Sequence, residues 1–124
     1  MFIVISPLNP DPMYKQVTDQ IKDAIADGTL KSEDKLPSIR EMSKELKISP
    51  ITIKRAYADL ENEGFIITRA GMGTYVAEIN RDRLRTEKLD EIKRELRRLL
   101  ASGSKFNISS KDLTRLIEEM EDRS

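Results

Sequence analysis

The side chains best suited to chemistry in this sequence are basic, and they gather in one segment. Between residues 38 and 58, five cationic side chains stand against two acids, whereas residues 11–34 carry six acids against three lysines. The five cations are Arg40, Lys44, Lys47, Lys54 and Arg55. Because Lys and Arg are the side chains that bind phosphate, this segment is a candidate anion-binding surface within a chain of zero net charge.

The composition excludes several kinds of active site. The 124 residues include no His and no Cys, so thiol redox chemistry, Cys or Ser–His nucleophilic catalysis and the usual zinc sites are ruled out. The 22 acidic residues are spread over predicted helix faces and form no convergent site. We therefore expect no enzyme, no metal and no cofactor.

The beginning of the chain predicts neither a signal peptide nor a membrane span. Residues 1–5 are apolar, but this run is short, lacks a basic leader and is followed by Pro7 and Pro10. The lack of Cys is compatible with a reducing compartment. We expect a cytoplasmic protein without a membrane partner.

Two helices are expected before residue 47. Asp11 and Pro12 predict a helix in which Asp11 is the cap and Pro12 the first helical residue, and Gly28 ends it. Ser38 with Glu41 three residues later predicts a capping box that opens the second helix.

A third helix is expected from Ser49–Pro50 to Gly64, after a connection of only Lys47, Ile48 and Ser49. Apolar residues recur at helical spacing in all three helices and predict the core. They are Tyr14, Val17, Ile21, Ala24, Ile25, Ile39, Met42, Leu46, Ile53, Ala56, Tyr57 and Leu60.

The pattern then changes to that of strands. Residues 65–68 and 74–77 are β-branched and aromatic, and the segment that joins them contains Gly71 and Gly73, which predicts a hairpin. We expect a short third strand from the connection between the first two helices. Residues 2–5 are expected to form another strand, with its pairing left open.

The tail from residue 80 predicts two further helices with narrow apolar stripes. Gly103 is expected to break the first, and Ser109 with Asp112 predicts a capping box for the second. The stripe comprises Leu89, Ile92, Leu96, Leu99, Leu113, Leu116, Ile117 and Met120. Because these helices carry too few apolar residues for a core of their own, the stripe is interpreted as a dimerisation surface, with an intrachain cap as the alternative.

This order of elements predicts a mainly α fold with a small β-wing, namely a winged helix-turn-helix over residues 1–78 followed by a two-helix module over residues 79–124. The short turn makes the third helix project from the core. Its outward residues would be Pro50, Ile51, Thr52, Lys54 and, at the edge, Arg55. Side chains at such a helix start, together with unbonded amides there, suit contacts to phosphates and base edges.

Three motifs resemble the GntR-type transcriptional regulators, in the right order and at the right spacing over residues 10–77. They are Leu36–Glu41, Ile48–Ile66 and Gly71–Val76. The short tail is similar to the YtrA-like subfamily, whose members end in a small helical dimerisation module. The sequence departs from the usual pattern at Glu33, where a glycine is common, at Ser43, where Ala is common, and at Pro50, where many relatives have Arg.

The resemblance implies which residues contact DNA. They are Arg40 at the start of the second helix, Ser49, Pro50, Ile51, Thr52 and Lys54 at the recognition helix, and Arg69 and Gly71 at the wing. Arg55 either joins them or covers the core with its stem. The basic cluster Arg81, Arg83 and Arg85 either contacts phosphates at a hinge or is merely solvated.

We therefore expect a sequence-specific DNA-binding transcriptional regulator, more specifically a repressor, that binds an inverted-repeat operator in double-stranded DNA as a homodimer. The alternative is a winged-helix module whose third helix meets a protein. The sequence identifies no effector ligand. Any inducer would sit at the dimer interface or between tail and winged domain, since two short helices enclose no ordinary cavity.

Overall fold

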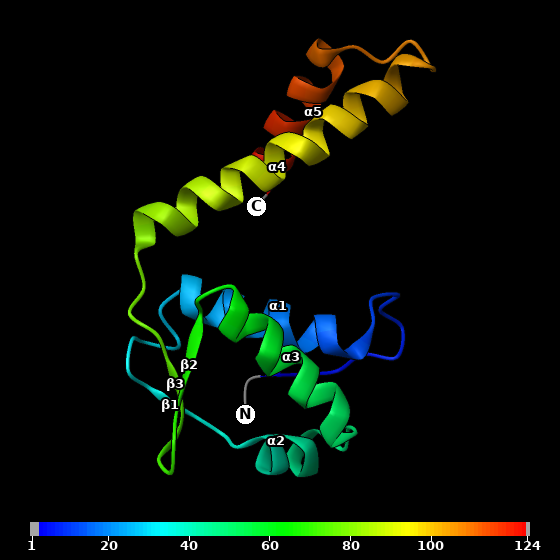
Figure 1. Ribbon diagram of the computed structural model, residues 1–124. Helices are drawn as coiled ribbons and strands as arrows, with labels where there is room; N and C mark the ends of the chain where they lie inside the picture. Colours follow the sequence, from blue (N-terminus) through cyan, green and yellow to red (C-terminus); the bar gives the residue numbers. More distant parts are fainter. Residues whose placement is uncertain (1–2, 124) are drawn as a thin grey trace. The chain divides into compact units, whose positions relative to one another are not determined.

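The computed structural model describes residues 3–123 and contains five helices and three strands within that range (Figure 1). The elements are α1 Met13–Ala26, β1 Lys35–Leu36, α2 Ile39–Leu46, α3 Pro50–Asn62, β2 Ile66–Arg69, β3 Gly73–Val76, α4 Arg81–Ser104 and α5 Ser110–Asp122. The chain divides after Arg81 into two compact units. The fold is therefore mainly α with a small sheet, as the sequence predicted.

The caps of α2 and α3 confirm the sequence prediction. The Glu41 amide donates to Ser38 Oγ at 3.0 Å and the Ser38 amide donates to Glu41 Oε1 at 3.4 Å, which completes the capping box. Ser49 caps α3 with Pro50 at the first helical position. Lys47, with a φ of 57°, ends α2 in the left-handed conformation and allows the short turn.

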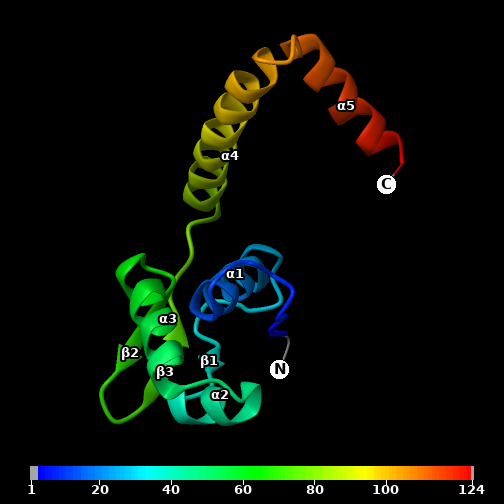
Figure 2. The same cartoon turned by 90° about the vertical axis from the view of Figure 1, so that its right-hand side faces the viewer.

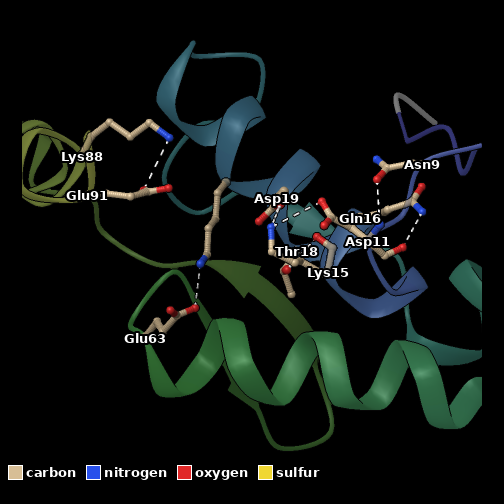
Figure 3. A network of polar contacts seen from close by, with 10 residues as sticks. Asn9, Asp11, Lys15, Gln16, Thr18, Asp19, Glu63, Lys88 and Glu91 are labelled. Atoms are coloured by element: carbon tan, nitrogen blue, oxygen red, sulfur yellow. Dashed lines mark hydrogen bonds and ion pairs between the residues drawn. The ribbon is translucent and has the colours of Figure 1, made fainter. Parts of the chain in front are cut away.

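The predicted cap of α1 was wrong. Pro12 is the N-cap, and no side-chain hydrogen bond caps the helix. Instead, the Asp11 amide donates to Asn9 Oδ1 at 2.9 Å, and the Asp11 carboxylate lies 3.6 Å from Lys15 Nζ (Figure 3). Asp11 thus belongs to a local turn with Asn9 and does not cap the helix, which begins one residue later than the Asp–Pro pair predicts.

The three strands form an antiparallel sheet in the order β1–β3–β2. Tyr75 of the central strand β3 pairs with Lys35 of β1 on one side and with Ile67 of β2 on the other. The hairpin and the third strand from the connection before α2 were both predicted. The strands β2 and β3 lie within one residue of the predicted ranges.

The core of the first unit lies where α1, α3 and the sheet meet. Among the predicted core residues, Tyr14, Ile39 and Leu46 are only half-buried, and the others are buried. Those with at most 1% exposure are Val17, Ile21, Ile25, Met42, Ile53, Ala56 and Leu60. Full burial of such side chains stabilises the unit by about 1.5 to 3 kcal/mol each for the larger ones.

The N-terminal strand predicted for residues 2–5 is not formed at residues 3–5, and residue 2 lies outside the described residues. Side-chain amides of α1 take the place of a partner strand. The Val4 amide donates to Gln20 Oε1 at 2.9 Å, the Gln20 amide donates to the Val4 carbonyl at 2.7 Å, and the Ser6 amide donates to Gln16 Oε1 at 3.0 Å. These bonds satisfy backbone groups that a sheet would otherwise have to satisfy.

In the second unit, α5 leaves α4 through a tight turn at Lys105–Ser109 (Figure 2). Gly103 lies in the last turn of α4, and Asn107, with a φ of 60°, supplies the left-handed residue of the turn. Ser109 and Asp112 form the predicted capping box of α5. Within residues 3–123, no helix is both long and apolar enough to span a membrane.

Candidate nucleic-acid interface

The N-terminal turn of α3 presents most of its side chains to solvent. Ser49, Pro50 and Lys54 are exposed, Ile51 is 79% exposed, and Thr52 is half-buried. The buried opposite face of α3 fixes this orientation. The sequence predicted unbonded backbone amides at this helix start, but the first amides are hydrogen-bonded. The Ile51 amide donates to Ser49 Oγ at 3.3 Å, and the Thr52 amide donates to the Ser49 carbonyl at 3.0 Å. Side chains rather than amides are therefore the groups that this turn offers.

Arg40 is the second residue of α2 and is exposed. The start of this helix is tied to α3 through Tyr57, whose hydroxyl donates to the Pro37 carbonyl at 2.7 Å. Burial, with a smaller contribution from the charge of Glu41, raises the pKa of Tyr57 above its usual value. The hydroxyl therefore remains a hydrogen-bond donor at neutral pH.

The wing is the turn between β2 and β3. The Met72 amide donates to the Arg69 carbonyl at 2.9 Å, and Gly71 adopts a φ of 73° at an exposed position. Among residues 3–123, no atom lies within 4 Å of the place that a Cβ on Gly71 would occupy, so the turn requires its conformation and not its small size.

Arg69 is less available than the sequence suggests. Its Nη2 lies 2.6 Å from Glu33 Oε2, and its guanidinium lies 4.6 Å from the ring centroid of Tyr75. It is half-buried. The guanidinium is thus held on two sides within the first unit.

The structure brings the predicted contact segments together on one side of the first unit. In Figure 1, α2, the start of α3 and the tip of the wing lie along its lower edge, and α1 lies on the opposite side. Arg55, by contrast, stacks on Tyr14 of α1, with 3.7 Å between its guanidinium carbon and the ring centroid. This contact favours the interpretation that Arg55 packs on the core, through a cation–π interaction.

Sequence reasoning missed Lys35 as part of the wing. A Cβ built on Gly73 would lie 3.0 Å from Lys35 Cε and 3.6 Å from Lys35 Nζ, so this ammonium lies beside the wing backbone. Only the pairing of β1 with β3 brings it there. The sequence predicted a short strand in this region, but two residues are too few to predict its register against β3 and hence the position of Lys35.

The predicted tail stripe is largely exposed, and neither α4 nor α5 contains a buried residue. Leu113 is half-buried, and the other seven stripe residues are 38–66% exposed.

In the basic cluster, Arg81 donates to the Ala26 carbonyl at 2.8 Å, and Arg83 pairs with Glu87 at 3.0 Å. These two arginines therefore have partners within the chain, and Arg85 is exposed.

Three helices with a three-residue turn between α2 and α3, followed by a glycine-tipped hairpin, define a winged helix-turn-helix protein. Residues 13–76 match the family of bacterial regulatory proteins described as the gntR family. The chain belongs to the GntR family of DNA-binding transcriptional regulators.

Individual relatives agree with this assignment. The chain is 35% identical over 118 residues to the HTH-type transcriptional repressor YtrA of Bacillus subtilis, covering 95% of this chain and 91% of that protein. A GntR family transcriptional regulator from Listeria monocytogenes superposes with a TM-score of 0.73 and 32% identity, over 90% of this chain and 96% of that one. The DNA-binding domain of AraR in complex with operator ORX1 superposes with a TM-score of 0.53 and 32% identity, over 60% of this chain and 92% of that one.

Proposed function

We propose that this protein is a repressor that binds an inverted-repeat operator as a homodimer in the cytoplasm. The observation that carries this proposal is the exposed turn that opens α3, which lies on the same side of the first unit as α2 and the wing (Figure 1). That combination fits one face of a DNA duplex, with a helix in the major groove and the wing at the flanking minor groove. YtrA, which matches nearly the whole chain, is described as a repressor.

The proposed roles follow from side-chain chemistry. Lys54 and Arg40 are exposed cations suited to phosphates or to guanine edges. Ser49 and Thr52 offer hydroxyl groups, which hydrogen-bond to phosphates or bases. Pro50 and Ile51 offer apolar surface for the thymine methyl group. At the wing, Gly71 and Arg69 would meet the minor groove.

The second unit, α4 and α5, supports the dimer. An apolar stripe without a buried member is unusual in a monomer, and a second copy of the same stripe is its simplest complement. Pairing two winged units makes the second DNA contact intramolecular, which raises the overall affinity without new contacts. We assign residues 1–78 to DNA binding and residues 79–124 to dimerisation, with any effector bound at this second module.

Footprinting on the DNA upstream of the protein's own gene tests the proposal. We expect a protected inverted repeat whose half-sites are centred about 34 to 36 Å apart, or a multiple of that distance. Protection of a single unsymmetrical half-site would contradict the dimer. The absence of binding to any duplex at low salt would contradict DNA binding itself.

A further inference from the structure

Glu33 holds an unusual backbone conformation. Its φ is 74°, in the left-handed region that residues with a Cβ rarely occupy. Glycine adopts this conformation without penalty, whereas the Cβ of a glutamate makes it strained. A strained residue of this kind persists only where its surroundings hold it, and it often marks a functional position.

The surroundings of Glu33 hold both its backbone and its carboxylate. Its amide donates to the Val76 carbonyl at 2.9 Å, which anchors the residue to the end of β3. Its Oε2 lies 2.6 Å from Arg69 Nη2, across a separation of 36 residues in the chain. Arg69 in turn lies against Tyr75, whose hydroxyl donates to the Met72 carbonyl at 3.2 Å. The carboxylate is therefore aimed at the one arginine that flanks the tip of the wing.

We propose that Glu33 sets the affinity and specificity of the wing by competing with DNA for Arg69, an inference that rests on the proposed function. The Glu33 carboxylate binds the Arg69 guanidinium, which is then not available to bind a DNA phosphate or base. While Glu33 and Arg69 are paired, their charges cancel, so Arg69 adds no net positive charge to the wing when the protein binds non-specific DNA. Glu33 thereby weakens non-specific binding.

The pair is exposed enough to open on the right DNA. The side chains of Arg69 and Glu33 are 35% and 58% exposed, and ion pairs of this kind are weak and screened by salt. A narrow A·T-rich minor groove concentrates negative potential and attracts arginine more strongly than an ordinary groove does. We therefore expect Arg69 to leave Glu33 only where such a groove meets the wing, which favours operators with that feature.

A double-mutant cycle on the full chain tests the competition. The four proteins are the wild type, Glu33→Gln, Arg69→Gln and the double variant, and the measurement is fluorescence anisotropy with a short mixed-sequence duplex between roughly 50 and 200 mM salt. We expect Glu33→Gln to steepen the dependence of log K on log[salt] by about one unit. Arg69→Gln should lower the slope less in the wild type than in the Glu33→Gln background, where it should remove the gain. Equal effects of Arg69→Gln in both backgrounds would overturn the inference.

Two further variants separate competition from general charge and from folding. Glu61→Gln removes an equal charge beside β2, where Glu61 accepts a 3.4 Å hydrogen bond from Thr68, and its effect should not depend on Arg69. Glu33→Gly removes the same carboxylate but relieves the backbone, so it should reproduce the slope of Glu33→Gln. A different slope would mean that the backbone, not the charge, matters, and would contradict the inference. If the wild type binds no duplex at all, the proposed function fails; if it binds but the cycle is additive, only this inference fails.

Discussion

The hydroxyl of Tyr57 donates a 2.7 Å hydrogen bond to the carbonyl of Pro37, twenty residues earlier in the chain. Tyr57 belongs to the buried face of α3, and Pro37 directly precedes the capping box of α2. This hydrogen bond therefore joins α3 to the turn that precedes α2, the helix that carries Arg40. This bond links the geometry of the proposed contact surface to the core.

Replacing Tyr57 with Phe tests that link. The variant keeps the ring in the core but leaves the Pro37 carbonyl without this donor, which should lower the free energy of unfolding by about 1 to 2 kcal/mol. Urea unfolding followed by circular dichroism measures the loss. Duplex affinity should also fall, because the start of α2 is less firmly held. An unchanged affinity would show that α2 does not depend on this bond.

The same bond predicts a dependence on alkaline pH. Burial raises the pKa of Tyr57 in the folded protein above the ordinary value of 10.0, whereas the unfolded chain ionises near that value. The stabilisation is therefore complete below pH 10 and is lost as the pH rises through the folded pKa. Unfolding curves measured up to that range should show a steeper loss of stability for the wild type than for Tyr57→Phe. Parallel curves would contradict the assignment.

Much of the first unit could be predicted from sequence because its signals are local. The Ser38–Glu41 box, the Ser49–Pro50 start and the glycine-tipped hairpin each involve residues within a few positions of one another. The wrong cap of α1 came from a local turn at Asn9, whereas the wrong strand at residues 3–5 came from contacts distant in the sequence. The segment at residues 3–5 pairs with side chains of α1, which no strand pattern reveals.

The wing shows the same limit at the candidate site. Arg69 was predicted as a contact residue from its place beside Gly71, but its partner Glu33 lies 36 residues away in the chain. Lys35 reaches the wing only through the register of a two-residue strand. Local patterns therefore predict which residues reach the surface, and the tertiary fold decides which of them are already paired.

Gly71 and Gly64 provide a matched pair for testing the wing. Both adopt positive φ, 73° and 85°, and neither has an atom within 4 Å of a built Cβ. Replacement of either by Ala should cost about 1 to 2 kcal/mol of stability through backbone strain alone. Only Gly71→Ala should also weaken duplex binding, because its methyl group would meet the groove. Equal loss of binding in both variants would contradict entry of the wing into DNA.

The dimer proposal predicts a strong effect at Leu96. This side chain is 38% exposed in the single chain, so Leu96→Glu should leave the fold intact but place a charge in the shared stripe. We expect a monomer by analytical ultracentrifugation, with duplex affinity reduced at least tenfold by the loss of the tethered second contact. Arg94→Glu is the control, because two residues along a helix rotate the side chain to about the opposite face. A dimeric Leu96→Glu would exclude this stripe as the interface.

The salt dependence of duplex binding by Lys54→Ala tests the account most directly. Lys54 is exposed on α3. Lys15 is an exposed lysine on α1, where its ammonium lies 2.6 Å from Asp19 Oδ2, and it serves as the control. Each Lys54 contact with a phosphate should contribute about 0.9 to the slope of log K against log[salt] per bound protomer. We predict that Lys54→Ala lowers the slope by about that amount per protomer, while Lys15→Ala leaves it unchanged. Equal slopes for both variants and the wild type would contradict docking of α3 on DNA.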